Sequence, residues 1–257
     1  SWDDANANAD NIMYAIQTSI ENKKNKIEDS FTTHMHIHDR YYDTAVKNKY
    51  YSKSYVLKAE RKLKIAENFS LGFGSDYNYN KGNFQVKGNW GSSARGHSDN
   101  VGIYSNSGYK LNDSTILSMH LRGDSHKYSQ ENLTYRLNAT KLIEKFTFSL
   151  SESTGIRHPD LYVLHGVNPS GSFKAMKTTK PETSLTRELS VNYDINNNLN
   201  FNTVVYKSKV SDVLNRGTST HGYNEIIDIK QEGLESNFEI KNKNHRLLLS
   251  SVFSKSR

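Results

Sequence analysis

Residues 185–193 read Leu185-Thr186-Arg187-Glu188-Leu189-Ser190-Val191-Asn192-Tyr193. Successive side chains of an extended chain point to opposite faces, so this stretch places Leu185, Leu189, Val191 and Tyr193 on one face. The other face carries the polar side chains Thr186, Glu188, Ser190 and Asn192. Such an alternation predicts a β-strand with one apolar and one polar face.

The same alternation recurs along the chain in about twelve runs of about ten residues each. Clear examples begin at Phe69, Leu117, Leu133, Phe146 and Leu234. A strand that rises ~3.3 Å per residue and is tilted by ~40° climbs ~25 Å in ten residues, which is the height of the apolar band of a membrane β-barrel. We therefore predict an all-β fold, an antiparallel up-and-down transmembrane β-barrel that is partial, with about twelve strands of a larger barrel.

The connections between these runs alternate in length. Short polar turns are expected at 22–26, 112–114, 143–145, 194–198 and 242–244. Longer polar stretches fall between them, at 40–50, 80–100, 123–131, 155–181 and 215–224. Short turns at one end and long loops at the other end are typical of transmembrane barrels, where the long loops face the outside.

Composition excludes several other classes of protein. The chain of 257 residues has no Cys, 35% hydrophobic residues and a mean hydropathy of -0.77. No stretch approaches the roughly 18 consecutive apolar residues of a membrane-spanning helix. The formal net charge is +7, but the basic residues are spread among 27 acidic residues, so nucleic-acid binding is not expected. We expect no cofactor.

From Phe146 to Ser184, the sequence carries a distinctive order of motifs. Gly155-Ile156-Arg157-His158-Pro159 is followed by Leu161-Tyr162-Val163-Leu164-His165-Gly166, then by Asn168-Pro169 and Lys180-Pro181-Glu182-Thr183-Ser184. This order resembles the TonB-dependent outer-membrane receptors, although His158 stands where Ala is usual and residues 170–179 are inserted. The later segments 201–214 and 223–235 are similar to the cobalamin and siderophore receptors of that family.

The resemblance implies a 22-stranded barrel that encloses an N-terminal plug and takes up a scarce large solute, such as cobalamin, a ferric siderophore or haem. It also implies a TonB-type energy-coupling partner, contact with outer-membrane lipid and a location in the bacterial outer membrane. We expect residues 1–257 to be one barrel segment, with the plug and the C-terminal strands outside this sequence. The alternatives are a passive porin-like or adhesin barrel and a soluble secreted β-sheet binding protein.

A row of three histidines is the strongest candidate for metal binding. His34, His36 and His38 share one face of a predicted strand, while Phe31, Met35 and Ile37 share the other. Imidazole is a common metal ligand, but alternate residues of a strand lie ~6.6 Å apart, so a metal ion would need a further ligand from a neighbouring strand. The alternative is a polar row that faces a wet barrel interior.

Ligand capture is expected in the long loops, where large aromatic and basic side chains gather. Aromatic rings offer rigid contact area, and Arg offers paired donors for a bulky or anionic chelate. The candidates for solute binding are Tyr41, Tyr42, Trp90, Arg95, His97, Arg157, His158 and Tyr162. Aromatic girdles at the membrane interfaces are the alternative role for Tyr41 and Tyr42. No nucleophile motif or paired carboxylate site is present in the sequence, so we do not expect an enzyme.

Overall fold

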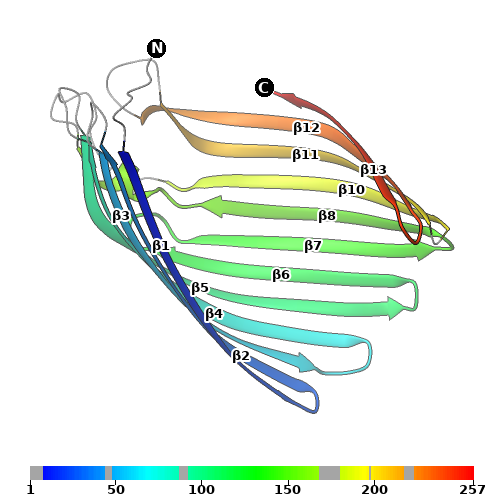
Figure 1. Ribbon diagram of the computed structural model, residues 1–257. Helices are drawn as coiled ribbons and strands as arrows, with labels where there is room; N and C mark the ends of the chain where they lie inside the picture. Colours follow the sequence, from blue (N-terminus) through cyan, green and yellow to red (C-terminus); the bar gives the residue numbers. More distant parts are fainter. Residues whose placement is uncertain (1–7, 44–47, 87–91, 168–179, 197, 217–222) are drawn as a thin grey trace.

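All long elements of the computed structural model are β-strands, and each pairs with the next as an antiparallel neighbour (Figure 1). The structure describes residues 8–43, 48–86, 92–167, 180–196, 198–216 and 223–257. Within them, the elements in chain order are β1 (Asn8–Lys24), β2 (Ile27–Asp43), β3 (Asn48–Lys64), β4 (Phe69–Val86), β5 (Ser92–Asn112), β6 (Thr115–His126), β7 (Asn132–Ile143), β8 (Phe146–Arg157), α1 (Leu161–His165), β9 (Gly166–Val167), β10 (Glu182–Asn196), β11 (Leu199–Arg216), β12 (Tyr223–Lys241) and β13 (Arg246–Ser256). This arrangement confirms the predicted antiparallel up-and-down fold.

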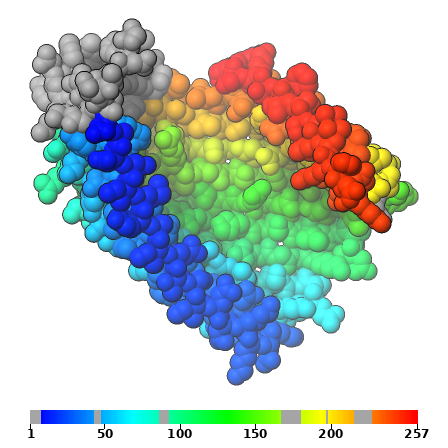
Figure 2. Space-filling view, viewed as in Figure 1, coloured from blue at the N-terminus to red at the C-terminus, as the bar shows by residue number. Residues whose placement is uncertain are grey.

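The described strands form one curved sheet that does not close. Its order is β1-β2-β3-β4-β5-β6-β7-β8-β10-β11-β12-β13, and the short β9 lies off this path against β5. Figure 2 shows the hollow concave face between the blue edge of β1 and the red edge of β13. The sheet is therefore part of a barrel wall, with one unpaired edge at each end.

The strands are longer than the ten residues expected, because backbone pairing continues beyond the apolar runs. β5 spans 21 residues and β4 spans 18. Most of the stretch 40–50, which we predicted as a loop, belongs to β2 and β3, and only 44–47 lies between them. Likewise, only 87–91 of the predicted loop 80–100 lies between β4 and β5. The short turns were predicted correctly at 112–114 and 143–145.

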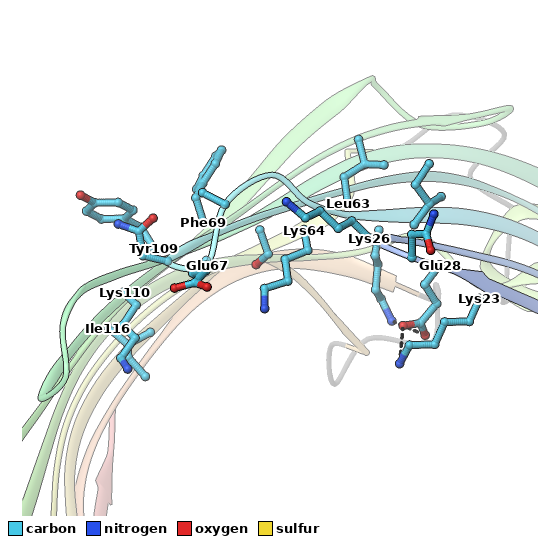
Figure 3. A pocket seen from close by; sticks show the side chains of 17 residues that line it. Lys23, Lys26, Glu28, Leu63, Lys64, Glu67, Phe69, Tyr109, Lys110 and Ile116 are labelled. Atoms are coloured by element: carbon cyan, nitrogen blue, oxygen red, sulfur yellow. Dashed lines mark ion pairs between the residues drawn. The ribbon is translucent and has the colours of Figure 1, made fainter.

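The pairing register sorts the side chains into two continuous faces. Leu189 of β10 is aligned with Leu150 of β8 and Val205 of β11, whereas its neighbour Ser190 is aligned with Ser149 and Val204. The apolar set is exposed on the convex side: Leu150 is 60% exposed and Val205 52%. In Figure 3, Phe69 and Leu63 point away from the hollow of the sheet, while Lys64 and Glu67 point into it.

Polar side chains on the concave face form hydrogen bonds with one another. Arg122 of β6 donates hydrogen bonds to Asp76 of β4 and to Asp124, the latter at 2.7 Å from Nη2 to Oδ1. Asn100 of β5 donates to the same Asp124 at 2.9 Å. This network ties three strands together on the side where a membrane barrel encloses its interior.

The described residues form a single layer with almost no internal core. Their buried hydrophobic side chains are Ala94, Val163 and Leu164, all at the contact between α1 and β5. A soluble sandwich would bury one face of each sheet against another sheet, so the single layer of the described strands does not fit the sandwich alternative. No helix in the described part of the chain is long and apolar enough to cross a membrane.

Candidate functional site

The segment after β8 turns back into the hollow of the sheet and forms the short helix α1. Asp160 caps the helix, because its carboxylate accepts a hydrogen bond from the backbone N–H of Val163 at 2.8 Å. Pro159 precedes the cap, and the steric clash of its ring with the preceding residue disfavours the helical region for His158. Gly166 ends the helix by donating its N–H to the carbonyl of Tyr162.

Two glycines on neighbouring strands make room for α1. Gly82 of β4 and Gly96 of β5 are direct partners in the register. A Cβ atom at Gly82 would lie 2.9 Å from Leu161 Cδ1, and one at Gly96 would overlap the imidazole ring of His165. The helix therefore lies on the concave face in a notch that any larger side chain at Gly96 would fill.

Backbone pairing holds the segment beyond the helix. β6 pairs with β5 only as far as His126 and Asn100, so the outer part of β5 has an edge that β6 does not cover. β9 occupies part of that edge, with Gly166 opposite Ala94 and Val167 opposite Ser93. The returning segment is thus fixed by hydrogen bonds as well as by side-chain packing.

A pair of stacked histidines adjoins α1. The rings of His126, at the end of β6, and His158, in the connection after β8, have centroids 4.4 Å apart and planes 9° apart. His158 Nδ1 is hydrogen-bonded to the hydroxyl of Ser129 at 2.8 Å. The ring of Tyr128 meets that of His165 edge-on at 5.2 Å. These contacts bring α1 and two connections into one aromatic group.

Both stacked rings favour the neutral form. Burial lowers the pKa of His126 to about 4, and the nearby His158 adds to that effect. Burial also lowers the pKa of His158, against the opposing influence of Asp124. His158 Nε2 and His165 Nε2 are buried and have no hydrogen-bond partner among the described residues. Each of these two nitrogen atoms could form one hydrogen bond with a group that reached it.

A chain of aromatic rings extends from α1 to β2 along the rim of the concave face. Phe84 of β4 lies 5.3 Å from Tyr162 and 4.6 Å from Tyr50 of β3, measured between ring centroids. Tyr50 lies 6.3 Å from Tyr42 of β2. We call the whole group the rim cluster, and its members are Tyr42, Tyr50, Phe84, His126, Tyr128, His158, Tyr162 and His165.

The structure separates the predicted solute-binding residues into two sets. Tyr42, His158 and Tyr162 come together in the rim cluster. Arg157, the last residue of β8, donates to Glu182 at 3.3 Å on the same side of the sheet.

The other candidates do not join this group. Tyr41, Arg95 and His97 lie on strands rather than in loops, and the register places them on the convex face. Trp90 lies outside the described residues.

Sequence reasoning missed five members of the rim cluster. All five lie in stretches that we expected to be loops, but residue type alone did not single them out, because Tyr50, Phe84, His126, Tyr128 and His165 meet their partners only through the fold. One sequence feature did point to the helix: Pro159-Asp160 is a helix start signal, and Gly166 follows the apolar residues. No feature of the sequence reveals that Gly82 and Gly96 are partners.

The histidine row lies on the concave face of β2, the polar side on which it was expected. The rings of His36 and His38 are 6.2 Å apart, and His38 Nε2 is hydrogen-bonded to Asn11 Oδ1 at 2.6 Å. The described residues contain no group of three His, Cys, Asp or Glu side chains arranged to hold a metal ion.

A second hollow, of about 440 Å³, lies at the turn ends of β1 to β5 (Figure 3). Glu28 lies 3.9 Å from both Lys23 and Lys62. The lining of this hollow has more lysines than carboxylates: Lys23, Lys26, Lys62, Lys64 and Lys110 against Glu28 and Glu67. This hollow is at the opposite end of the strands from the rim cluster.

Comparisons with known proteins agree with this architecture. A family model described as TonB dependent receptor-like, beta-barrel matches residues 1–238. No curated protein sequence matches the chain.

Several solved structures share the fold at low sequence identity. The siderophore receptor PirA from Pseudomonas aeruginosa is 16% identical, with a TM-score of 0.73 over 96% of this chain and 51% of its own. The siderophore receptor PiuA from Acinetobacter baumannii is 12% identical, with a TM-score of 0.77 over 96% of this chain and 47% of its own. A copper transporter, OprC, is 12% identical, with a TM-score of 0.71 over 95% of this chain and 46% of its own. The chain spans about half the length of these structures.

Proposed function

Because the chain belongs to the TonB-dependent receptor β-barrel family, we propose that it forms part of the wall of an outer-membrane receptor that takes up a scarce large solute. The neighbours with this fold include siderophore receptors and a copper transporter. The apolar convex face suits contact with lipid acyl chains, and the polar concave face suits a hydrated or plugged interior. The wall itself carries out no chemistry in this proposal.

The observation that carries the proposal is the rim cluster. Eight aromatic or imidazole rings form two groups of four, joined through α1, at the loop ends of the strands and on the concave side, where an incoming solute would pass. Flat rings give a large rigid contact area for a bulky solute. A bulky metal chelate of the ferric siderophore class fits this chemistry best; haem and cobalamin are the competing solutes.

Uptake in this proposal is binding followed by gated passage. The rim cluster holds the solute, and a TonB-type partner supplies the energy that moves a plug out of the way. The histidine row of β2 faces the same interior. A transition metal ion or haem that passed through this interior would meet His34, His36 and His38.

Uptake by the full-length receptor tests the proposal. Cells expressing it are fractionated, and uptake of labelled ferric siderophores, haem and cobalamin is compared with and without the coupling protein. We expect the receptor in the outer-membrane fraction, and uptake of one solute that stops when the coupling protein is deleted. Uptake that continues without the coupling protein would identify a passive pore, and a receptor that stays soluble without detergent would refute any membrane function.

A further inference from the structure

A row of lysines, with one histidine among them, lies on the convex face just beyond the apolar band. Lys53 of β3 is the direct partner of Lys81 of β4, and Lys81 is the direct partner of His97 of β5. Lys127, one residue past β6, donates to His97 Nε2 at 2.8 Å. Direct partners on one face of a sheet have Cβ atoms about 4.5–5.5 Å apart, so these four side chains form one compact group.

The arrangement is unfavourable without an anionic partner. Like charges placed directly opposite each other destabilise an antiparallel pair. Neither Lys53 nor Lys81 forms an ion pair with any residue that the structure describes, and Lys127 lies 3.9 Å from Asp99. On the outer part of β2 to β5, the outward-facing cations of the described chain outnumber the carboxylates: Lys49, Lys53, Lys81 and Arg95 against Asp39 and Asp99. Lys127, just past β6, adds a further cation.

Aromatic rings lie directly beneath the cationic row. Tyr55 and Tyr79 have ring centroids 6.3 Å apart, and the ring of Tyr79 stacks with that of His97 at 5.8 Å. The side chain of Lys53 interacts with the phenol groups of Tyr51 and Tyr55 on the same strand. The apolar residues of the convex face begin below these rings, with Leu57, Tyr77 and Val101 aligned in the register. Aromatic rings at this level mark the membrane interface, so the cations lie at the depth of the lipid headgroups.

We propose that Lys53, Lys81 and Lys127 bind the phosphate groups of an anionic lipid in the surrounding outer leaflet. This inference rests on the proposed function, because it requires the convex face to meet lipid. A phosphate group is a compact anion that accepts several hydrogen bonds, and lysine ammonium groups bind it as point charges. The acyl chains of the same lipid would lie along the apolar band below.

Lipid binding by the delipidated full-length receptor in detergent tests the site. The probes are bisphosphorylated lipid A, its dephosphorylated form and inorganic phosphate, with bound lipid counted by native mass spectrometry. The double variant Lys53→Gln/Lys81→Gln removes two cations from the row. The control Lys62→Gln/Lys64→Gln removes the same charge at the other end of β3, where the register puts both lysines on the concave face.

We expect Lys53→Gln/Lys81→Gln to weaken binding of the bisphosphorylated lipid roughly 30-fold, and the control to leave it unchanged. Added salt should weaken the binding, because Lys81 and Lys127 are exposed. Equal binding of the dephosphorylated lipid, equal loss in the control, or displacement by inorganic phosphate at the lipid's own concentration would overturn the inference. A receptor that reaches the outer membrane and takes up its solute but fails this test refutes the lipid site alone.

Discussion

Gly82 and Gly96 face each other across strands β4 and β5, and the side chains of Leu161 and His165 occupy the space above them. The buried hydrophobic residues of the described chain, Val163, Leu164 and Ala94, lie at this contact. The fit of α1 into the notch therefore decides whether the rim cluster assembles, and two variants probe it directly.

Gly96→Val should displace α1 from the sheet, because the new side chain would overlap the ring of His165. The measurement is amide hydrogen exchange in the full-length receptor, where the N–H of Leu164 is bonded to the carbonyl of Asp160 at 3.1 Å. Its protection should be lost in Gly96→Val. Gly123→Ala is the control, since a Cβ there would have its nearest neighbour at 3.8 Å. Full protection in Gly96→Val would contradict the packing described.

Asp160→Ala should loosen α1 by removing its N-terminal cap. The carboxylate accepts from the N–H of Val163 at 2.8 Å, and loss of such a cap costs about 1 kcal/mol. We expect faster amide exchange at Val163, whereas Asp160→Asn keeps an acceptor oxygen and should remain close to the wild type. Equal exchange rates in the two variants would show that the cap does not stabilise the helix.

Acid should release the returning segment through the stacked histidines. The pKa of His126 is about 4 in the folded protein against an ordinary 6.5, so the open form binds more protons between these values. Stability of the docked segment is therefore full above pH 6.5 and falls as the pH drops toward 4. His158 shifts in the same direction, and Asp99, Asp124 and Arg122 are the charged groups around the pair.

The measurement for this pH effect is amide exchange at Leu164 as a function of pH. His126→Phe keeps an aromatic ring but removes the titrating group, so comparison at each pH separates its titration from the intrinsic pH dependence of exchange. We expect the variant to lose most of the acid-induced opening. The same opening in wild type and variant would assign the effect to other groups.

Tyr41 and Tyr42 are adjacent in the chain but point to opposite faces of the sheet, which makes them a matched pair. Tyr42 belongs to the rim cluster, whereas Tyr41 lies on the convex face. If the proposed function is correct, Tyr42→Ala should weaken solute binding about fivefold through lost aromatic contact, and Tyr41→Ala should leave it unchanged. Isothermal titration with the transported solute measures both. Equal effects of the two variants would remove the rim cluster from the binding site.

Leu189 and Ser190 test which face meets lipid. Leu189→Lys would place a charge in the middle of the convex apolar face, at a cost of about 2–4 kcal/mol if that face lies in a bilayer. Ser190→Lys places the same charge on the concave face and should cost far less. Unfolding of the full-length receptor in lipid vesicles by urea gives both values. Equal destabilisation by the two variants would rule out the assigned faces.

The alternation of residues was sufficient to predict the strands, their antiparallel order and the two faces of the sheet. It was insufficient for the strand ends, because beyond the apolar band both faces carry polar residues. Asp39, Arg40 and Tyr41 resemble a loop in composition, yet they continue β2 because their backbone groups pair with β3. Hydrogen bonding of the backbone, which is independent of side-chain polarity, sets those ends.

The candidate site was predicted only in part, for a related reason. Tyr42, His158 and Tyr162 were selected for their chemistry, and they do share a cluster. Tyr41, Arg95 and His97 were selected on the same grounds. Residue type does not reveal that the strands continue beyond the apolar band, or on which face of the strand each of these side chains lies. Contacts such as that between His126 and His158 join positions 32 residues apart in the chain and depend on the finished sheet.

The glycine notch also sets an order of assembly. Neighbouring strands joined by a short turn can form their backbone pairs progressively from that turn outward, since their contacts are local in the sequence. The notch needs β4 and β5 to be paired already, because each strand supplies only one of its two glycines. Residues 158–167 therefore reach their final position only after that hairpin exists, and the rim is completed late, as a closing step that depends on a correctly paired wall.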